Sequence, residues 1–557
     1  MEELISIFCK NNSSVKQYKP GVSLLEIYED QKITLRSQVL LAKVNNRVQN
    51  LSFRVYKPKD VEFVDITDPA GRHAYIHSLF FIMYKAVSEL FPGSNISLEH
   101  PVSKGYYCEL NIGHRLTDAE LSAVKIRMQE IIELNIPIDY LQEHTTTVIE
   151  HFRNVGAMDK VDLLQTVGSL YTCYYKMGGL IDYYYEGLVP YTGFIYLFDL
   201  LPFDNGVLLR IPSSSHPKLL EDVVAQPKMH DVFEEYQRWN EIMGIESVGK
   251  FNTSIKEGKA SGLIKVSEAL HEKKISYMAD RIYKKWKEAG TLKFIMISGP
   301  SSSGKTTFSK RLGVQLMTNG LVPVALSLDD YFVDRDKTPR DEKGEYNFES
   351  IYALDLDLFN KQLKQLVDGE EVELPTYSFE TGKRLFKGNK LKVENNTLII
   401  IEGIHALNPE LTQLIDQSMK YMIYVSALTT ISMDNHNRIS TTDNRLLRRI
   451  LRDHLYRGYS AQETIKRWPS VRSGEDKWIF PYQENADEMF NSALIFELAV
   501  IKKYVEPILS EVPQNCVEYS EARRLLHVLS YLSPIYDNEI PPTSLLREFL
   551  GGSSFRY

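Results

Sequence analysis

The chain has 557 residues, of which 43% are hydrophobic and 25% are charged, as in globular proteins with packed cores. This length is too great for one ordinary core and predicts two to four domains. The formal net charge of −8 disfavours a protein that coats a polyanion, although a local basic groove is compatible with it.

The sequence gives no sign of export or membrane insertion. Met1 is followed by Glu2 and Glu3 instead of a basic segment and an apolar run, so no signal peptide is expected. No apolar stretch approaches the ~20 residues that span a bilayer. The four cysteines are scattered without a C-x-x-C pair, which favours a reducing compartment and gives no zinc signature. We therefore expect a cytoplasmic protein.

The first half of the chain predicts two α+β units. Residues 1–62 alternate short strand-like runs with turns, and Ser23 can cap a helix that starts at Leu24. Residues 63–212 carry two long helical patterns, at 74–90 and 116–134.

The rest of the chain divides into a connector, a further domain and an extension. Residues 213–290 are polar with mostly helical spacing and predict a helical connector. Within residues 291–510, buried strands alternate with helices, which is typical of a parallel sheet wrapped by helices. Residues 511–557 predict a C-terminal helical extension.

A phosphate-binding loop follows the first buried strand of the 291–510 domain. The apolar run Phe294–Ile297 leads into eight residues that fit G-x-x-x-x-G-K-[ST], and a helical pattern with Phe308 and Leu312 on one face comes next. Glycines let successive N–H groups point at phosphate oxygens, and the helix adds the positive end of its dipole. Lys305 can reach the outer phosphates of a triphosphate, and the Thr306 hydroxyl can ligate Mg²⁺. The residues expected to bind ATP are Gly299, Pro300, Ser301, Ser302, Ser303, Gly304, Lys305, Thr306, Thr307 and, from a later helix, Arg457.

Two further buried strands end in acidic residues. One leads into Asp329 and Asp330, and the next leads into Glu402. In open parallel sheets, ligands bind at the carboxyl ends of the strands. Asp329 can therefore deprotonate an attacking hydroxyl, with helix capping as the alternative. Glu402 can support Mg²⁺ together with Thr306.

A run of arginines lies on one predicted helix. Arg445, Arg448 or Arg449, and Arg452 recur at helical spacing and share one face. Arginine clusters suit bidentate phosphate contacts, so this face predicts a mobile lid that closes over the triphosphate. An RNA-contacting face is the alternative. The expected catalytic residues are Asp329, Lys305, Arg449 and Arg452.

The order of these motifs resembles the phosphoribulokinase/uridine kinase family over residues 292–505. The resemblance rests on the phosphate loop, Asp329–Phe332, Tyr346–Glu349, Pro375–Phe379, Glu402–Ile404, Asp443–Asp453 and Arg457–Gly458. It implies that Asp329 is the base for a 5′-hydroxyl and that Glu349 holds the ribose hydroxyls. The residues that it places at the substrate are Asp329, Tyr331, Glu349, Tyr377, Phe379 and Arg448.

Three positions depart from the family pattern. Glu349 replaces the usual aspartate, Gly382 stands where uridine-cytidine kinases carry a base-recognising histidine, and Tyr459 replaces a second arginine. A pocket that lacks a polar base contact discriminates less between bases. The ribose side is therefore better preserved than the pyrimidine side.

The front of the chain resembles the N-terminal half of threonyl-tRNA synthetases: a β-grasp TGS module at 1–62, then an editing-like α+β domain at 63–212. The resemblance rests on Pro20–Leu24, Ala42–Asn46, His77–Ser78, Phe91–Pro92 and Glu99–Tyr107. The family's editing domain uses H-x-x-x-H. With His77 matched to the first histidine, Phe81 stands at the second position, and no later Cys-x-x-x-His follows. We therefore expect a scaffold, regulatory or RNA-sensing part instead of an editing enzyme.

These features predict an ATP- and Mg²⁺-dependent kinase that phosphorylates the 5′-hydroxyl of a nucleoside, with uridine or cytidine foremost. Another nucleoside or a sugar phosphate is an alternative acceptor, and an RNA-associated NTPase switch is a rival of a different class. Asp329 favours the kinase, because a switch needs a residue that positions water instead of a base beside an acceptor. The expected partner is a nucleoside, and no membrane partner is expected. The sequence leaves open whether the front half contacts RNA and whether the chain forms a homo-oligomer.

Overall fold

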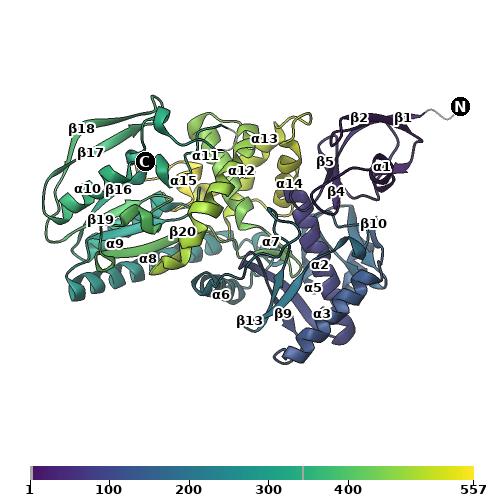
Figure 1. The fold of residues 1–557 in the computed structure, drawn as a ribbon. Helices are drawn as coiled ribbons and strands as arrows, with labels where there is room; N and C mark the ends of the chain where they lie inside the picture. Colours follow the sequence, from purple (N-terminus) through teal and green to yellow (C-terminus); the bar gives the residue numbers. More distant parts are fainter. Residues whose placement is uncertain (1–3, 342–343, 557) are drawn as a thin grey trace.

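The computed structural model describes residues 4–341 and 344–556. The N-terminal strands lie at one end of the molecule and the C-terminal parallel sheet lies at the other, with helices packed between them (Figure 1). None of the helices formed by the described residues has the length and apolar character that a bilayer crossing requires.

The N-terminal end is a mixed five-stranded sheet crossed by one helix. The predicted start of α1 (Leu24–Gln31) is confirmed, because Ser23 and Glu26 form a reciprocal capping box there. Leu24 and Ile27 are buried in the core beneath the sheet. The sheet has the order β2-β1-β7-β4-β5, and β3 pairs with β6. The strands are β1 (Ile5–Cys9), β2 (Ser14–Tyr18), β3 (Val22–Ser23), β4 (Leu41–Val44), β5 (Arg47–Gln49), β6 (Arg54–Val55) and β7 (Lys59–Val64).

The second region packs two long helices with an antiparallel sheet of order β13-β14-β9-β8. Asp68 caps α2 (Pro69–Leu90), and Thr117 caps α3 (Asp118–Glu133). A smaller sheet, β10-β11-β12, lies beside them. The strands are β8 (Asn95–Val102), β9 (Gly105–Asn111), β10 (Ile138–His144), β11 (Tyr171–Met177), β12 (Leu180–Asp182), β13 (Asp199–Phe203) and β14 (Gly206–Arg210).

The largest hydrophobic core combines helices from both halves of the chain. α4 (Thr145–Asn154), α5 (Met158–Val167) and α7 (Val248–Lys256) share it with helices α11 to α14. The two halves are therefore joined by continuous packing, although their sequences resemble unrelated families. The other helices are α6 (Pro227–Met243), α8 (Ala260–Ala289), α11 (Thr441–Arg457), α12 (Ala461–Trp478), α13 (Glu497–Ser510), α14 (Tyr519–Ser530) and α15 (Arg547–Leu550).

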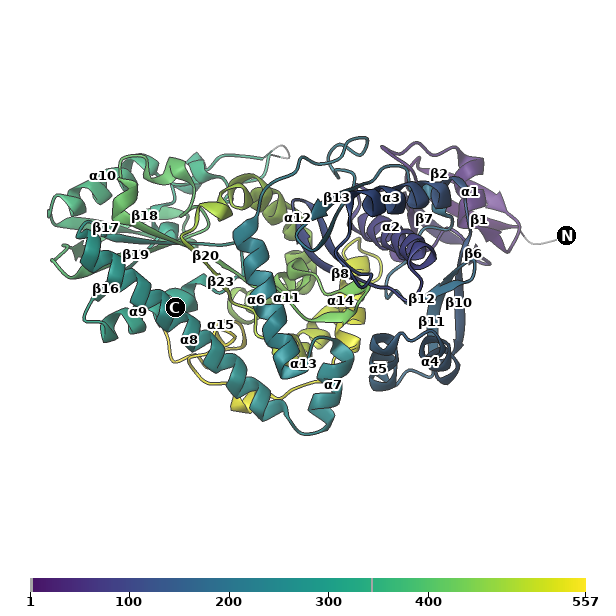
Figure 2. The same cartoon turned by 90° about the horizontal axis from the view of Figure 1, so that it is seen from below.

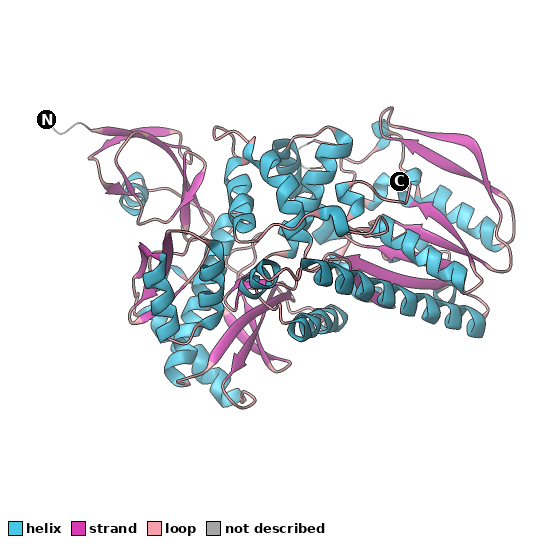
Figure 3. Ribbon diagram, turned by 180° about the vertical axis from the view of Figure 1, so that it is seen from behind, coloured by secondary structure: helices cyan, strands magenta, loops and turns pink. Residues whose placement is uncertain are grey.

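The C-terminal sheet is parallel, has the order β16-β19-β15-β20-β23, and carries helices on both faces (Figures 2 and 3). Ile295 and Ile297 of β15 pack with α8 and α9, whereas Phe294 and Met296 pack with α6 and α10. The predicted parallel sheet wrapped by helices is thus confirmed. Its elements, with two adjoining hairpins, are β15 (Phe294–Ser298), α9 (Lys305–Thr318), β16 (Val322–Ser327), α10 (Leu356–Val367), β17 (Val372–Ser378), β18 (Lys383–Leu391), β19 (Thr397–Glu402), β20 (Lys420–Ser426), β21 (Ser432–Asp434), β22 (Asn437–Arg438) and β23 (Glu488–Asn491).

The strand register brings three chain segments to one edge of this sheet. Ile297 of β15 and Ser327 of β16 both pair with Glu402 of β19. The phosphate loop, Asp329 and Glu402 therefore emerge side by side at the carboxyl ends of the strands, where such sheets bind ligands.

Candidate active site

The loop between β15 and α9 wraps around the Lys305 side chain. Lys305 Nζ donates to the carbonyl oxygens of Gly299 at 2.9 Å and Pro300 at 3.1 Å. Gly304 has a φ of +80°, in the left-handed region. A Cβ on Gly299 would lie 1.9 Å from the carbonyl oxygen of Val425 in β20. Both motif glycines are thus required by the path of the backbone.

Thr306 and Glu402 lie together at the start of α9. The Thr306 hydroxyl donates to Glu402 Oε1 at 3.1 Å, and Glu402 Oε2 is buried without a hydrogen-bond partner among the described residues. Burial raises the pKa of Glu402 to about 7, while Lys305 opposes the shift. In phosphate-transfer sites, Mg²⁺ is bound by one or two protein oxygens together with substrate phosphates. A hydroxyl beside an unpartnered carboxylate oxygen fits that ion.

Asp329 lies just beyond β16, on the 3₁₀ turn Leu328–Tyr331, and the Ser327 hydroxyl accepts its N–H at 3.2 Å. Desolvation raises the pKa of Asp329, Lys305 opposes this shift, and Asp330 adds to it. Within the described chain, no hydrogen bond holds its carboxylate. This carboxylate is therefore available to accept a proton close to Lys305.

Two arginines of α11 are buried behind the phosphate loop. Arg445 Nε donates to the Ser301 carbonyl oxygen at 3.0 Å, and its guanidinium pairs with Glu475. Arg448 is fully buried and pairs with Glu497. Arg448 therefore supports the loop from behind, which argues against its predicted contact with a substrate. Because α11 is packed into the largest core, it forms a wall of the site, which argues against the predicted mobile lid.

Arg449 and Arg452 lie on the side of α11 that faces the site. Arg449 Nη1 donates to the Ser301 hydroxyl at 2.9 Å, and Arg452 is close enough to Asp329 to lower its pKa. Burial lowers the pKa of Arg452 to about 10, so it is still charged at neutral pH. Asp453 orients two arginines of this helix: its carboxylate accepts from Arg449 Nε at 3.3 Å and from Arg457 Nη1 at 3.2 Å.

The residues predicted to bind the acceptor are divided between the site and the core. Glu349 lies near Lys305 and Arg449, which counteract the burial that raises its pKa. The rings of Tyr377 and Phe379 meet edge to face with centroids 5.1 Å apart. Phe379 is exposed and Tyr377 is 6% exposed, whereas Tyr331 is 1% exposed and donates its hydroxyl to Gln362 at 2.7 Å. This placement in the core argues against direct contact between Tyr331 and a substrate.

Comparison with known proteins finds relatives of two classes, threonine–tRNA ligases and uridine kinases. The threonine–tRNA ligase of Desulforamulus reducens is 26% identical over 226 residues, which is 39% of this chain and 35% of that protein. The chain thus spans about a third of the length of the ligases it matches. A solved structure, described as that of a possible uridine kinase from Bacillus stearothermophilus, shares 20% identity over 39% of this chain and 100% of that chain, with a TM-score of 0.26.

The C-terminal half gives the match that decides the family. Residues 294–496 match the model of the phosphoribulokinase/uridine kinase family. The uridine kinase of Staphylococcus aureus is 32% identical over 194 residues, which cover 35% of this chain and 84% of that protein. The chain belongs to the phosphoribulokinase/uridine kinase family.

Within this family member, Gly382 cannot carry a side chain without rearrangement. Its φ is +68°, and a Cβ would lie 2.8 Å from both Cβ and Nε of Arg335. Arg335 itself donates to the Phe379 carbonyl oxygen and lies beside the Tyr377 hydroxyl. Arg335 therefore occupies the space that a side chain at position 382 would need.

The sequence analysis did not identify the carboxylates that pair with the buried arginines of α11, Arg445 and Arg448. Glu475 is fully buried, accepts the Ser301 N–H at 3.0 Å and pairs with Arg445 and Arg472. Glu497, which is 1% exposed, pairs with Arg448. A usable signal was present, because several arginines on a helix with buried neighbours require acidic partners elsewhere in the chain.

The position assigned to the H-x-x-x-H motif was wrong. His73 precedes His77 by four residues, so the motif is present as His73–His77. Both side chains face Glu186, at 3.0 Å for His73 and 3.7 Å for His77. Glu186 also pairs with Arg524 at 3.4 Å, and Arg524 holds both oxygens of Asp443 in the first turn of α11. This chain of ion pairs links the synthetase-like half to the helix that carries the arginines.

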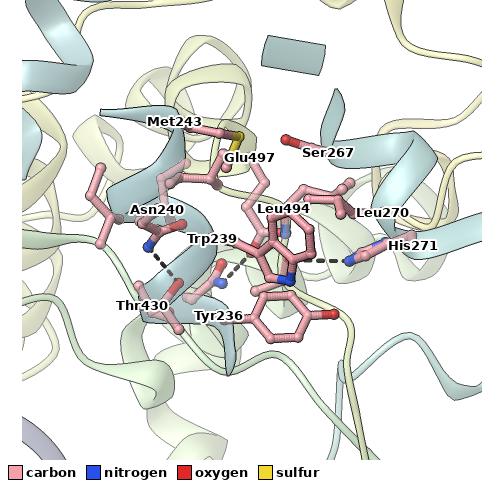
Figure 4. Close-up of a pocket in the computed structure, with 16 residues that line it drawn as sticks. Tyr236, Trp239, Asn240, Met243, Ser267, Leu270, His271, Thr430, Leu494 and Glu497 are labelled. Atoms are coloured by element: carbon pink, nitrogen blue, oxygen red, sulfur yellow. Dashed lines mark hydrogen bonds between the residues drawn. The ribbon is translucent and has the colours of Figure 1, made fainter. Parts of the chain in front are cut away.

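A separate pocket lies where α6 and α8 meet the segments that lead into α11 and α13 (Figure 4). Trp239, Leu270 and Leu494 supply apolar walls, and Asn240 and His271 are among its polar groups. Its volume of about 40 Å³ accommodates a few water molecules and is too small for a nucleotide. The residues that line it include none of those predicted for the active site.

Proposed function

We propose that this chain is an ATP- and Mg²⁺-dependent kinase that phosphorylates the 5′-hydroxyl of a nucleoside, with uridine as the foremost acceptor. The observation that carries the proposal is the meeting of the phosphate loop, the Thr306–Glu402 pair and Asp329 at one sheet edge. A simple nucleotide-binding site needs the first of these, whereas transfer to a hydroxyl also needs a base.

Each group has a role in the transfer. Lys305, Arg449 and Arg452 stabilise negative charge on the transferring phosphoryl group. When bound at Thr306 and Glu402, Mg²⁺ neutralises phosphate oxygens. The acceptor oxygen forms a bond to the terminal phosphorus, the bond to the departing ADP oxygen breaks, and the hydroxyl proton moves to Asp329.

Arg335 supports uridine over cytidine as the acceptor. Its guanidinium lies beside Tyr377 and Phe379 and offers hydrogen-bond donors only. Uracil presents a carbonyl oxygen where cytosine presents an amino group, so a donor at this edge leaves cytosine unsatisfied.

The deciding experiment measures ADP release from ATP with uridine, cytidine, other nucleosides and sugar phosphates, each with and without RNA. We expect uridine to accelerate ADP release most. Acceleration by a sugar phosphate alone would show that the acceptor is a sugar phosphate and not a nucleoside. ATP turnover that responds only to RNA would show that the protein is an NTPase switch and not a kinase.

Asp329→Asn tests the proposed base. We expect kcat to fall by about 10²–10⁴-fold with ATP affinity nearly unchanged, since the amide cannot accept the proton. Asp231→Asn, on the exposed side of α6, is the matched control and should leave kcat unchanged. Full transfer by the Asp329 variant would mean that the base is another residue.

A further inference from the structure

The carboxylate of Glu548, on α15, is bound to the first turn of α9. The Thr307 N–H donates to Glu548 Oε2 at 3.1 Å, and the Thr307 hydroxyl donates to the same oxygen at 2.7 Å. The first N–H groups of a helix have no partner within the helix, and after a phosphate loop they face the phosphates. Glu548 therefore engages donors that a phosphate oxygen would use.

Glu548 also faces the charges of the active site. It adds to the rise in the pKa of Glu402 and favours the charged form of Lys305. A nucleotide phosphate at Thr307 would place a second anion within hydrogen-bond distance of this carboxylate. Repulsion at such a distance is strong in a partly desolvated site, so the two anions exclude each other.

The segment that carries Glu548 is anchored independently of this contact. Arg547 donates to Asp537 Oδ2 at 3.1 Å and to the Ile540 carbonyl oxygen at 2.8 Å. Phe549 is fully buried, and the Arg448 guanidinium carbon lies over its ring, 5.0 Å from the ring centroid. Glu548 is thus delivered to α9 by a folded element.

Glu548 differs from the other carboxylate on the phosphate loop. Glu475 is fully buried between two arginines, which makes it a permanent part of the loop's support. Glu548, in contrast, is only partly buried.

We propose that the C-terminal segment, residues 537–556, is an autoinhibitory element in which Glu548 competes with the nucleotide for the start of α9. This inference rests on the proposed ATP-dependent function. ATP binding displaces the carboxylate from Thr307 and loosens the short helix α15 that carries it.

The test measures Mg²⁺·ATP binding to the full chain by calorimetry, without any acceptor. We expect Glu548→Ala to bind ATP about tenfold more tightly than wild type, since hydrogen bonds to a charged group no longer have to be broken. Glu548→Gln should show a smaller gain, because the charge is lost but the amide oxygen can still accept. Glu539→Gln removes the same charge from an exposed position of the same segment and should bind ATP like wild type. If Glu548→Ala does not fold, Glu548→Gln decides.

The inference is overturned if the Glu548 variants bind ATP as wild type does, or more weakly. Failure of the proposed function has a different signature: folded wild type, Lys305→Ala and the Glu548 variants would then all fail to bind ATP. Hydrogen exchange gives a second readout. Amides of residues 545–551 should exchange faster in wild type when ATP is added, and unchanged exchange would contradict the displacement.

Discussion

Replacing Arg524 by methionine should separate the synthetase-like half from the arginine helix in a measurable way. Arg524 lies on α14 and binds Asp443, at the start of α11, through two hydrogen bonds of 2.8 and 2.6 Å. It also reaches Glu186 at 3.4 Å. Methionine preserves most of the apolar stem and removes only the charge and the donors.

The expected loss follows from the burial of the groups left behind. The side chains of Asp443 and Glu186 are 5% and 10% exposed, so water cannot replace the guanidinium at either. Removing one partner of a buried ion pair costs about 3–5 kcal/mol, because a buried charge is left uncompensated. Here that charge is Asp443, since Glu186 keeps His73 as a partner at 3.0 Å. Glu521, with a side chain that is 27% exposed, adds little to this cost.

Urea unfolding of the full chain measures this loss, and Arg523→Met is its matched control. Arg523 is the preceding residue and is exposed, so its substitution should change the free energy of unfolding by less than about 0.5 kcal/mol. Hydrogen exchange should rise in the first turn of α11 in the Arg524 variant alone. Equal stability of the two variants would refute the view that these ion pairs join the halves.

Two further substitutions test the support of the phosphate loop and one buried histidine. Glu475→Gln should weaken ATP binding about tenfold, because it loosens Ser301 and leaves Arg445 without its charge partner. Asp476→Asn, at an exposed neighbouring position, is the control and should bind ATP like wild type. Unchanged ATP affinity of the Glu475 variant would contradict this role. Burial lowers the pKa of His271 to about 3, so below pH 6.5 the unfolded chain takes up a proton that the folded chain does not. Between pH 6 and pH 5, the free energy of unfolding of wild type should therefore fall more steeply than that of His271→Gln, by up to about 1.4 kcal/mol per pH unit, and equal slopes in denaturation curves would show that this histidine titrates normally.

The amino-acid sequence by itself determined the parts of this protein that are built from contiguous residues. The strand, loop and helix around Lys305 were predicted because glycine spacing and apolar periodicity are local properties. Asp329 and Glu402 were placed at one edge for a similar reason, since parallel strands end on the same side of a sheet.

Only the tertiary structure decided which charged and aromatic groups meet. Tyr331 and Tyr377 look alike in sequence, and both are buried in the folded chain, at 1% and 6% exposure. What separates them is a contact made by folding: the Tyr331 hydroxyl donates to Gln362, a side chain of the core. Thr307 and Glu548 are 241 positions apart, and no periodicity links them. Such contacts follow from how the helices pack, and packing depends on the shapes of all the side chains in the core instead of on any local pattern.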